Sequence, residues 1–181
     1  MAKKNTYPRT LAMITQFKNE LVVQMKKNLE KHNASGTLSE SIEATETTIV
    51  NDNLSFSIEM ADYYDFVDKG VKGADPSGIY KNNPDKQGVQ RAPNSPYSYK
   101  TKMPPPSKMD KWSVRKGIAP RDNKGRFLSR KGINFAIAKS IFHQGLKPTM
   151  FFTKAYNKYF TPQFELDLMV AYSQDLEENL R

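Results

Sequence analysis

Cysteine is absent from the 181 residues of this chain. That absence excludes a disulfide framework, a thiolate metal site and a cysteine nucleophile, and it fits assembly in a reducing cytoplasm. Long apolar runs are also absent, since none approaches the roughly 20 residues that a helix needs to span a bilayer. No apolar stretch follows the first residues in the manner of a signal peptide. The sequence therefore predicts a soluble protein that has no membrane partner and is not secreted by a conventional signal.

Common catalytic and nucleotide-binding motifs are missing as well. The chain has no Gly-Lys-Ser/Thr loop, no Gly-x-Gly-x-x-Gly after a predicted strand and no Gly-x-Ser-x-Gly elbow. The two histidines, His32 and His143, lack the neighbouring ligands of a zinc hydrolase. Each is predicted in the last turn of a helix, where an imidazolium suits the helix dipole. We expect no enzyme activity, no catalytic residue, no metal and no cofactor.

Three aspartates, Asp62, Asp65 and Asp68, precede a glycine-rich turn. We expect the preceding strand to continue through them, which places Asp62 and Asp65 on opposite faces of that strand. Carboxylates on opposite faces cannot bind one metal ion together. A helical turn would bring Asp65 and Asp68 together, but Lys69 is adjacent and no histidine is near. An enzyme with a carboxylate site is therefore the weakest interpretation.

Positive charge is concentrated in one segment. The net charge is +9, yet residues 69–131 hold 16 Lys/Arg against 4 Asp/Glu and the rest of the chain holds 12 against 15. Such a segment attracts phosphates or acidic protein surfaces, or it is a solvated loop that keeps the chain soluble. The candidate contacts with DNA or with another subunit are Lys100, Lys102, Lys108, Lys111, Trp112, Arg115, Lys116, Arg121, Lys124 and Arg126.

The same segment is rich in proline and glycine, especially over residues 70–107, where no regular pattern survives. We treat residues 70–131 as a basic loop insertion, because a loop of this length is usually functional or disordered. Within it, a short helix capped by Ser107 is predicted over residues 107–116. Residues 121–126 are predicted to form an exposed turn.

Hydrophobic periodicity predicts the remaining elements. Apolar residues three and four apart favour a helix from Pro8 to about His32. Two short runs, residues 47–50 and 54–60, flank Asn51-Asp-Asn53 and favour a hairpin, because the second run alternates apolar and polar residues. We therefore expect an α+β fold over a single domain, residues 1–181, with a small, mostly antiparallel sheet packed against amphipathic helices.

Two further helices are expected near the C-terminus. One follows Gly132 and ends at Gly145, and the last runs from about Pro162 to the end of the chain. We interpret residues 156–181 as a helical arm that packs at least partly against a neighbouring subunit. Its candidate inter-subunit residues form one apolar stripe: Phe164, Leu168, Met169, Tyr172 and Leu176.

Three short motifs occur in the order found in one protein family. Ala34-Ser-Gly-Thr-Leu-Ser-Glu-Ser-Ile42 resembles the small-Gly-x-Leu-x-x-Ser-Ile step of tail-completion and head–tail connector proteins of tailed bacteriophages. Tyr63-Tyr-Asp-Phe-Val-Asp-Lys-Gly-Val71 is similar to the family's Tyr-Ala-x-Tyr-Val-Glu-x-Gly-Thr motif, with Asp68 in place of Glu and Val71 in place of Thr. Lys147-Pro-Thr-Met-Phe-Phe-Thr-Lys-Ala155 resembles its Pro-x-Pro-Phe-Phe-x-x-Ala step. The resemblance spans residues 8–155.

The resemblance implies a virion protein rather than an enzyme. Members of the family assemble as homo-oligomeric rings in the neck between head and tail, next to portal or adaptor proteins and tail proteins. The ring encloses the DNA passage, so the basic loop would face genomic DNA or an acidic neighbour. The protein would be assembled in the host bacterial cytoplasm and reside in the virion.

The alternative is a sequence-nonspecific nucleic-acid-binding protein that uses residues 69–131. Aromatic residues lie among the cations of this segment, and aromatic rings can stack on unpaired bases. No known nucleic-acid-binding motif frames them. Steep salt dependence of DNA affinity would favour this alternative, whereas self-assembly into rings would favour the connector.

Overall fold

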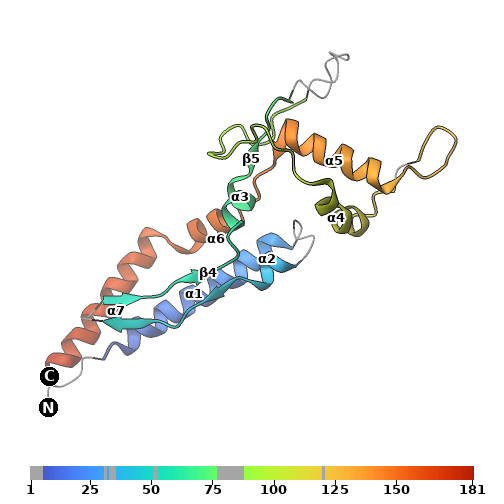
Figure 1. Cartoon of the computed structure of the whole chain (residues 1–181). Helices are drawn as coiled ribbons and strands as arrows, with labels where there is room; N and C mark the ends of the chain where they lie inside the picture. The colour runs from blue at the N-terminus through green and yellow to red at the C-terminus, as the bar shows by residue number, and fades with distance from the viewer. Residues whose placement is uncertain (1–5, 31, 33–35, 51–52, 77–87, 120) are drawn as a thin grey trace. The chain divides into compact units, whose positions relative to one another are not determined.

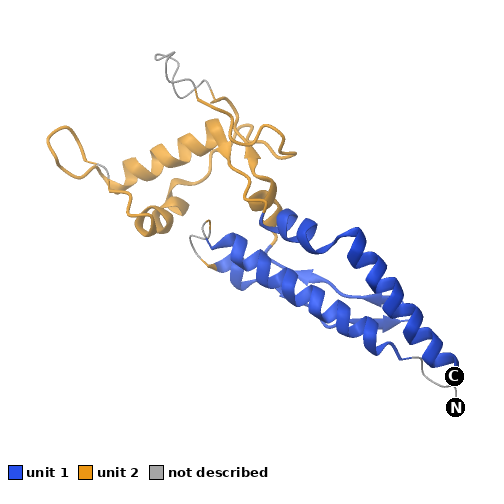
Figure 2. Ribbon diagram, turned by 180° about the vertical axis from the view of Figure 1, so that it is seen from behind, with its two compact units in different colours: residues 1–31, 37–61, 151–181 blue, residues 32–36, 62–150 orange. Residues whose placement is uncertain are grey.

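The computed structural model contains two compact units that alternate along the chain (Figures 1 and 2). It describes residues 6–30, 32, 36–50, 53–76, 88–119 and 121–181. Unit 1 comprises residues 1–31, 37–61 and 151–181, and unit 2 comprises residues 32–36 and 62–150. The chain is 54% helical, with 11% strand in small antiparallel sheets, so the predicted α+β class is confirmed.

Unit 1 is organised around one long helix, α1 (Pro8–Leu29). Pro8 occupies the first turn, where its missing N–H leaves no hydrogen bond unmade. The helix ends about one turn before the predicted limit at His32. Its buried apolar side chains recur at spacings of three and four residues: Ile14, Phe17, Leu21, Met25 and Leu29.

Two C-terminal helices pack on α1: α6 (Phe151–Tyr159) and α7 (Pro162–Leu180). Helix α7 was predicted, and Thr161 caps it by accepting a hydrogen bond from the Phe164 N–H at 3.2 Å. Helix α6 was not predicted, because only Phe151 and Ala155 mark its buried face.

The strands of unit 1 form two separate antiparallel pairs rather than one sheet. Strand β2 (Thr48–Val50) pairs with β3 (Asn53–Ser55), which confirms the predicted hairpin. Strand β1 (Glu43–Ala44) pairs with β4 (Ile58–Glu59) and follows the single-turn helix α2 (Thr37–Glu40). The predicted alternation holds, since the apolar residues from Leu54 to Met60 are half-buried and the polar ones between them are exposed.

Unit 2 begins with a helix where the sequence predicted a strand. Helix α3 (Tyr64–Lys69) contains two of the three aspartates, so the expected continuation of the strand is wrong. Alternation of apolar and polar residues stops at Met60, and the Asp65–Lys69 ion pair, 2.9 Å long, joins residues four apart as helices favour. Gly70, with φ of 72°, ends the helix.

The centre of unit 2 is helix α5 (Arg130–Gln144) with a small antiparallel pair, β5 (Val71–Lys72) and β6 (Gly145–Leu146). Gly145 ends α5, as predicted, with φ of 89°. A Cβ at Gly145 would collide with the carbonyl oxygen of Val71. The close approach of β6 to β5 therefore requires glycine at this position.

Part of the predicted loop is anchored to this pair. The Gln90 side chain accepts the Gly73 N–H (2.7 Å) and donates to the Gly73 carbonyl (3.1 Å). Ser95 Oγ donates to the Gly70 carbonyl at 2.7 Å, and the Lys72 N–H donates to the Tyr97 carbonyl at 2.8 Å. Residues 88–99 form no helix or strand, as expected, but these hydrogen bonds hold them in place. Strand β5 is a regular element that the sequence did not predict, and residues 77–87 lie outside the described part.

The short helix predicted at residues 107–116 is present in two pieces, the 3₁₀ helix η3 (Pro106–Met109) and α4 (Asp110–Arg115). Ser107 lies inside the first piece and is not its cap. Ser113 Oγ donates to Asn134 Oδ1 and Asn134 Nδ2 donates to Asp110 Oδ1, both at 3.1 Å. These bonds fix α4 against α5.

Candidate functional site

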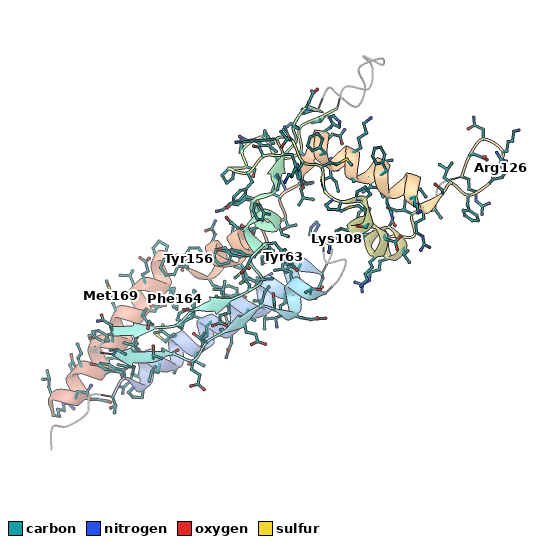
Figure 3. All side chains as sticks on the ribbon, viewed as in Figure 1. Tyr63, Lys108, Arg126, Tyr156, Phe164 and Met169 are labelled. Carbon is teal, nitrogen blue, oxygen red and sulfur yellow. The ribbon has the colours of Figure 1, made fainter. Side chains whose placement is uncertain are left out.

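A well-defined turn in the basic segment, residues 121–127, confirms the predicted turn at residues 121–126. It lies just before α5, where Arg126 is labelled in Figure 3, and a β-bridge between Arg121 and Phe127 closes it. Asp122 organises it, because one carboxylate oxygen accepts the N–H groups of Lys124 and Arg126, each at 2.9 Å. The Asp122 N–H donates in turn to the Arg126 carbonyl at 2.8 Å. Gly125, with φ of 79°, provides the left-handed position of the turn.

The charge of Asp122 is already engaged within the turn. The backbone hydrogen bond from Arg126 is the main influence that lowers the pKa of Asp122, and the Arg126 guanidinium adds an ion pair of 2.9 Å. The Asp122 carboxylate is therefore ionised and neutralised by Arg126. Among the described residues, the Lys124 ammonium has no carboxylate within ion-pair distance.

The Arg121 guanidinium lies over the ring of Phe127, 3.8 Å from its centroid, and donates to the Gly125 carbonyl at 2.8 Å. The Phe127 ring is 64% exposed. The turn thus presents two uncompensated cations, Arg121 and Lys124, beside an exposed aromatic ring.

The other predicted basic contacts lie elsewhere in unit 2. Lys100 and Lys102 precede η3, Lys108 is in η3, Lys111, Trp112 and Arg115 are in α4, and Lys116 follows α4. All the cations are exposed, whereas Trp112 is half-buried. The structure therefore places the ten candidates in one unit, but in two groups. One group lies on η3, α4 and the residues that flank them, and the other lies on the turn of residues 121–127; Lys108 and Arg126 mark the two groups in Figure 3.

The predicted stripe of α7 lies mainly on its own unit. The Phe164 ring stacks on Phe17 with centroids 4.5 Å apart, and the Tyr172 ring stacks on Tyr7 at 5.5 Å. Leu168 and Leu176 are half-buried, and Met169 is 68% exposed. A contact of this stripe with a neighbouring subunit stays a prediction, and Met169 is its most accessible member.

Two exposed apolar residues of α7, Leu166 and Val170, were missed from the sequence. Leu166 and Val170 are 56% and 54% exposed and, with Met169, lie three and four residues apart on one side of the helix. Phe164 and Met169 are labelled in Figure 3. The missed signal was the apolar run from Leu168 to Val170, which a single buried stripe does not explain. We call Leu166, Met169 and Val170 the outer face of α7.

The three aspartates have different surroundings. Asp65 accepts hydrogen bonds from the Tyr97 hydroxyl and from Lys69. Burial, the largest single influence, raises the pKa of Asp65, but these two donors outweigh it and the pKa is lowered. Asp68 is buried and Asp62 is exposed. Over the residues that the structure describes, no three His, Asp or Glu side chains form a group that could hold a metal ion.

No protein-family model, curated protein or solved structure matches this chain. In the described part of the chain, no helix is both long enough and apolar enough to cross a bilayer.

Proposed function

We propose that this chain is a structural protein of a tailed-bacteriophage virion that assembles as a ring at the head–tail junction. The ring would join head and tail around the DNA passage, with portal or adaptor and tail proteins as neighbours. The proposal rests on the three ordered motifs and on how their segments are used in the fold.

The observation that carries it is a direct link between the second and third motifs. Thr149 donates its N–H (3.1 Å) and its hydroxyl (2.8 Å) to the Val67 carbonyl, 82 residues away. The Met150 N–H donates to the Asp68 carbonyl at 3.0 Å. The two motif segments therefore lie side by side next to the β5–β6 pair, as a shared fold would require, and this supports the proposal.

The first motif is also a structural element of its unit. Leu38 and Ile42 are almost wholly buried, and Ser41 Oγ accepts the Ala61 N–H at 3.0 Å. The motif therefore joins α2 to the segment that follows β4. Residues that determine how a chain turns between its elements are the ones that a shared fold would retain.

The outer face of α7 supports self-association. Three large apolar side chains more than half exposed on one helical face are unfavourable in water and are typical of a contact surface. In a ring, each subunit would bury this face against the next one. Burying a Leu or Met side chain contributes about 1.5–3 kcal/mol, so the face would contribute substantially to each contact.

The test is the mass of the purified full-length chain in solution, measured by native mass spectrometry over a range of concentrations. We expect one closed oligomer, which the double variant Leu166→Glu/Met169→Glu disrupts because it places two charges in the buried contact. The matched control, Asn157→Glu/Gln174→Glu, adds the same charges at exposed polar positions of α6 and α7 and should still assemble. A wild-type chain that stays monomeric at every concentration would contradict the ring.

Nucleic-acid binding is the second candidate, favoured by the localised charge surplus. Residues 69–131 carry 16 Lys/Arg against 4 Asp/Glu. The two candidates are compatible if the ring encloses DNA. They differ in the primary readout, which is ring formation for the first and salt-dependent affinity for the second.

A further inference from the structure

We propose that the turn of residues 121–127 is a phosphate-binding element that contacts the backbone of a nucleic acid, with Arg121 and Lys124 as the contacting cations. This inference rests on the nucleic-acid contact named above and narrows it from a segment of 63 residues to one turn. It does not require the ring.

The turn is already in a fixed shape. Asp122 accepts two backbone N–H groups, and the Gly125 N–H donates to the Asp122 carbonyl at 2.9 Å. A loop that is ordered before binding loses less conformational entropy when a ligand orders it further. The turn can therefore hold its cations ready at little additional cost.

The positive charge of the turn is not cancelled. Asp122 is the turn's one carboxylate, and it is paired with Arg126. Arg121 and Lys124 are left without a carboxylate partner among the described residues. Each exposed, unpaired cation is free to replace a counterion on a phosphate.

The tip of the turn allows close approach. A Cβ built at Gly125 would meet no atom within 4 Å, so the backbone at this position faces open space. Beside it, the Arg121 guanidinium is held flat on the Phe127 ring. One guanidinium nitrogen donates to the Gly125 carbonyl, the remaining N–H groups can donate to phosphate oxygens, and the exposed ring can stack on an unpaired base.

The rest of the segment adds to the electrostatic attraction. Lys108, Lys111 and Arg115 are spaced three and four residues apart, so they share one side of the η3–α4 segment. Asp110, the other carboxylate between residues 100 and 131, accepts a hydrogen bond from Asn134 and lies 3.7 Å from Arg130. Residues 100–131 therefore present a large excess of positive charge to a polyanion.

A nucleic acid fits these observations better than an acidic protein. Charged residues are depleted at the centre of protein–protein contacts, where apolar and aromatic side chains dominate. Most protein–DNA hydrogen bonds, by contrast, go to phosphates and sugars, and arginine and lysine supply many of them. The exposed cations of the turn and α4 outnumber the large apolar side chains exposed beside them, Val114, Phe127 and Leu128, and match a repeating phosphate backbone.

The experiment measures fluorescence anisotropy of a labelled duplex and of a labelled single strand with the full-length chain, at salt concentrations from 50 to 200 mM. We compare the wild type with Arg121→Gln/Lys124→Gln. For duplex DNA, each lost phosphate contact lowers the slope of log affinity against log salt by about 0.9, so the double variant should lose about 1.8. For a single strand the corresponding loss is about 1.4.

Two further variants separate the turn from general charge and from misfolding. Lys139→Gln/Lys147→Gln removes two exposed cations from the same unit outside the turn, and we expect it to keep the wild-type slope. Lys124→Gln alone should lower the slope of log affinity against log salt by half as much as the double variant does. It should not disturb the turn, since the Lys124 side chain makes none of the bonds that shape it.

The outcomes are distinguishable. No binding of either DNA at 50 mM salt would overturn the nucleic-acid contact as a whole. Binding with equal slopes for the turn variant and the Lys139/Lys147 control would overturn the assignment to the turn alone. Displacement of DNA by polyglutamate as efficiently as by unlabelled DNA, at equal charge, would overturn a preference for nucleic acid and indicate an acidic protein partner.

Discussion

Asp175 caps the N-terminus of α1 from a different helix, and its replacement tests how unit 1 is held together. Its side chain, on α7, is fully buried. The residue before α1, Tyr7, provides no side-chain cap. Instead, Asp175 accepts the Thr10 N–H (2.9 Å) and hydroxyl (2.8 Å) and, less closely, the Arg9 N–H (3.3 Å). A negative charge at this position also suits the positive end of the helix dipole.

Asp175→Asn keeps the shape of the side chain but replaces one acceptor oxygen with an NH₂ donor. In either orientation of the amide, that donor faces a backbone N–H, of Arg9 or of Thr10, that needs an acceptor. A hydrogen bond to a charged group contributes about 1.5–3 kcal/mol and a helix cap typically about 1 kcal/mol. Because these effects overlap here, we expect unit 1 to lose about 2–4 kcal/mol of unfolding free energy. At about 2–4 °C per kcal/mol for a chain of this size, the midpoint should fall by about 4–16 °C.

The assay is thermal unfolding of the full-length chain followed by far-ultraviolet circular dichroism. Glu178→Gln is the matched control, because Glu178 lies on the same helix as Asp175 and pairs with Arg9 at 2.6 Å, but its side chain is exposed. Exposed ion pairs contribute little, so this control should leave the midpoint almost unchanged. Equal, small shifts for the two variants would refute the capping role.

The pH dependence has a defined sign. Burial, the largest influence, raises the pKa of Asp175, but hydrogen bonds from Thr10 and Arg9 outweigh it and the pKa is lowered. A carboxyl group with a lowered folded-state pKa stabilises the fold fully above its unfolded value and loses that contribution as pH falls through the folded value. The stability difference between wild type and Asp175→Asn should therefore be full at pH 7 and shrink below about pH 4. A difference that is unchanged at pH 3 would contradict the role of the charge.

Two further predictions concern unit 2. Gly145→Ala should lower the unfolding free energy by at least about 2 kcal/mol in urea titrations, because strain at positive φ adds to the collision with Val71. The control Gly117→Ala, at a position with φ of 63° and open space, should cost only about 1–2 kcal/mol. Equal costs for the two variants would refute the close-approach argument. Tyr97→Phe should raise the pKa of Asp65 toward its ordinary value in a carboxyl ¹³C NMR titration, because one of the two donors that lower it is lost. An unchanged titration would show that the Tyr97 hydroxyl does not bond to Asp65.

The long helices could be predicted from the sequence because their periodicity is unambiguous. Helix α1 buries a side chain every three or four residues over 22 residues, and no strand pattern competes with it. Helix α3 has six residues and α6 has nine, which is too short for a period to emerge. The adjacent aromatics Phe151 and Phe152 add to this difficulty, since only one of them lies on the buried face.

Contacts distant in the sequence could not be predicted. The Asp175–Thr10 bonds join residues 165 apart, and no local pattern marks either partner. For the same reason, the sequence did not show which side chains of α7 pack on its own unit, and residues 156–181 were interpreted as an arm that packs at least partly against a neighbouring subunit. Since Asp175 is fully buried and Tyr172 stacks on the buried Tyr7, removal of this helix would also remove part of the core of unit 1.

In the candidate site, too, local features could be predicted from the sequence and features that depend on packing could not. The basic segment and its turn are visible in the sequence, because charge and turn residues act locally. The neutralisation of Asp122 and the stacking of Arg121 on Phe127 follow from the geometry of the closed turn. The outer face of α7 required the structure, because only the packing of the opposite side reveals which apolar residues are left exposed.

The most direct test of the proposed function is electron microscopy of the purified full-length chain, with class averages of the particles. We predict closed rings of one size with a central opening wide enough for duplex DNA, and loss of those rings in Leu166→Glu/Met169→Glu. Monomers or open filaments alone, under conditions where the chain is folded, would contradict a neck-ring protein.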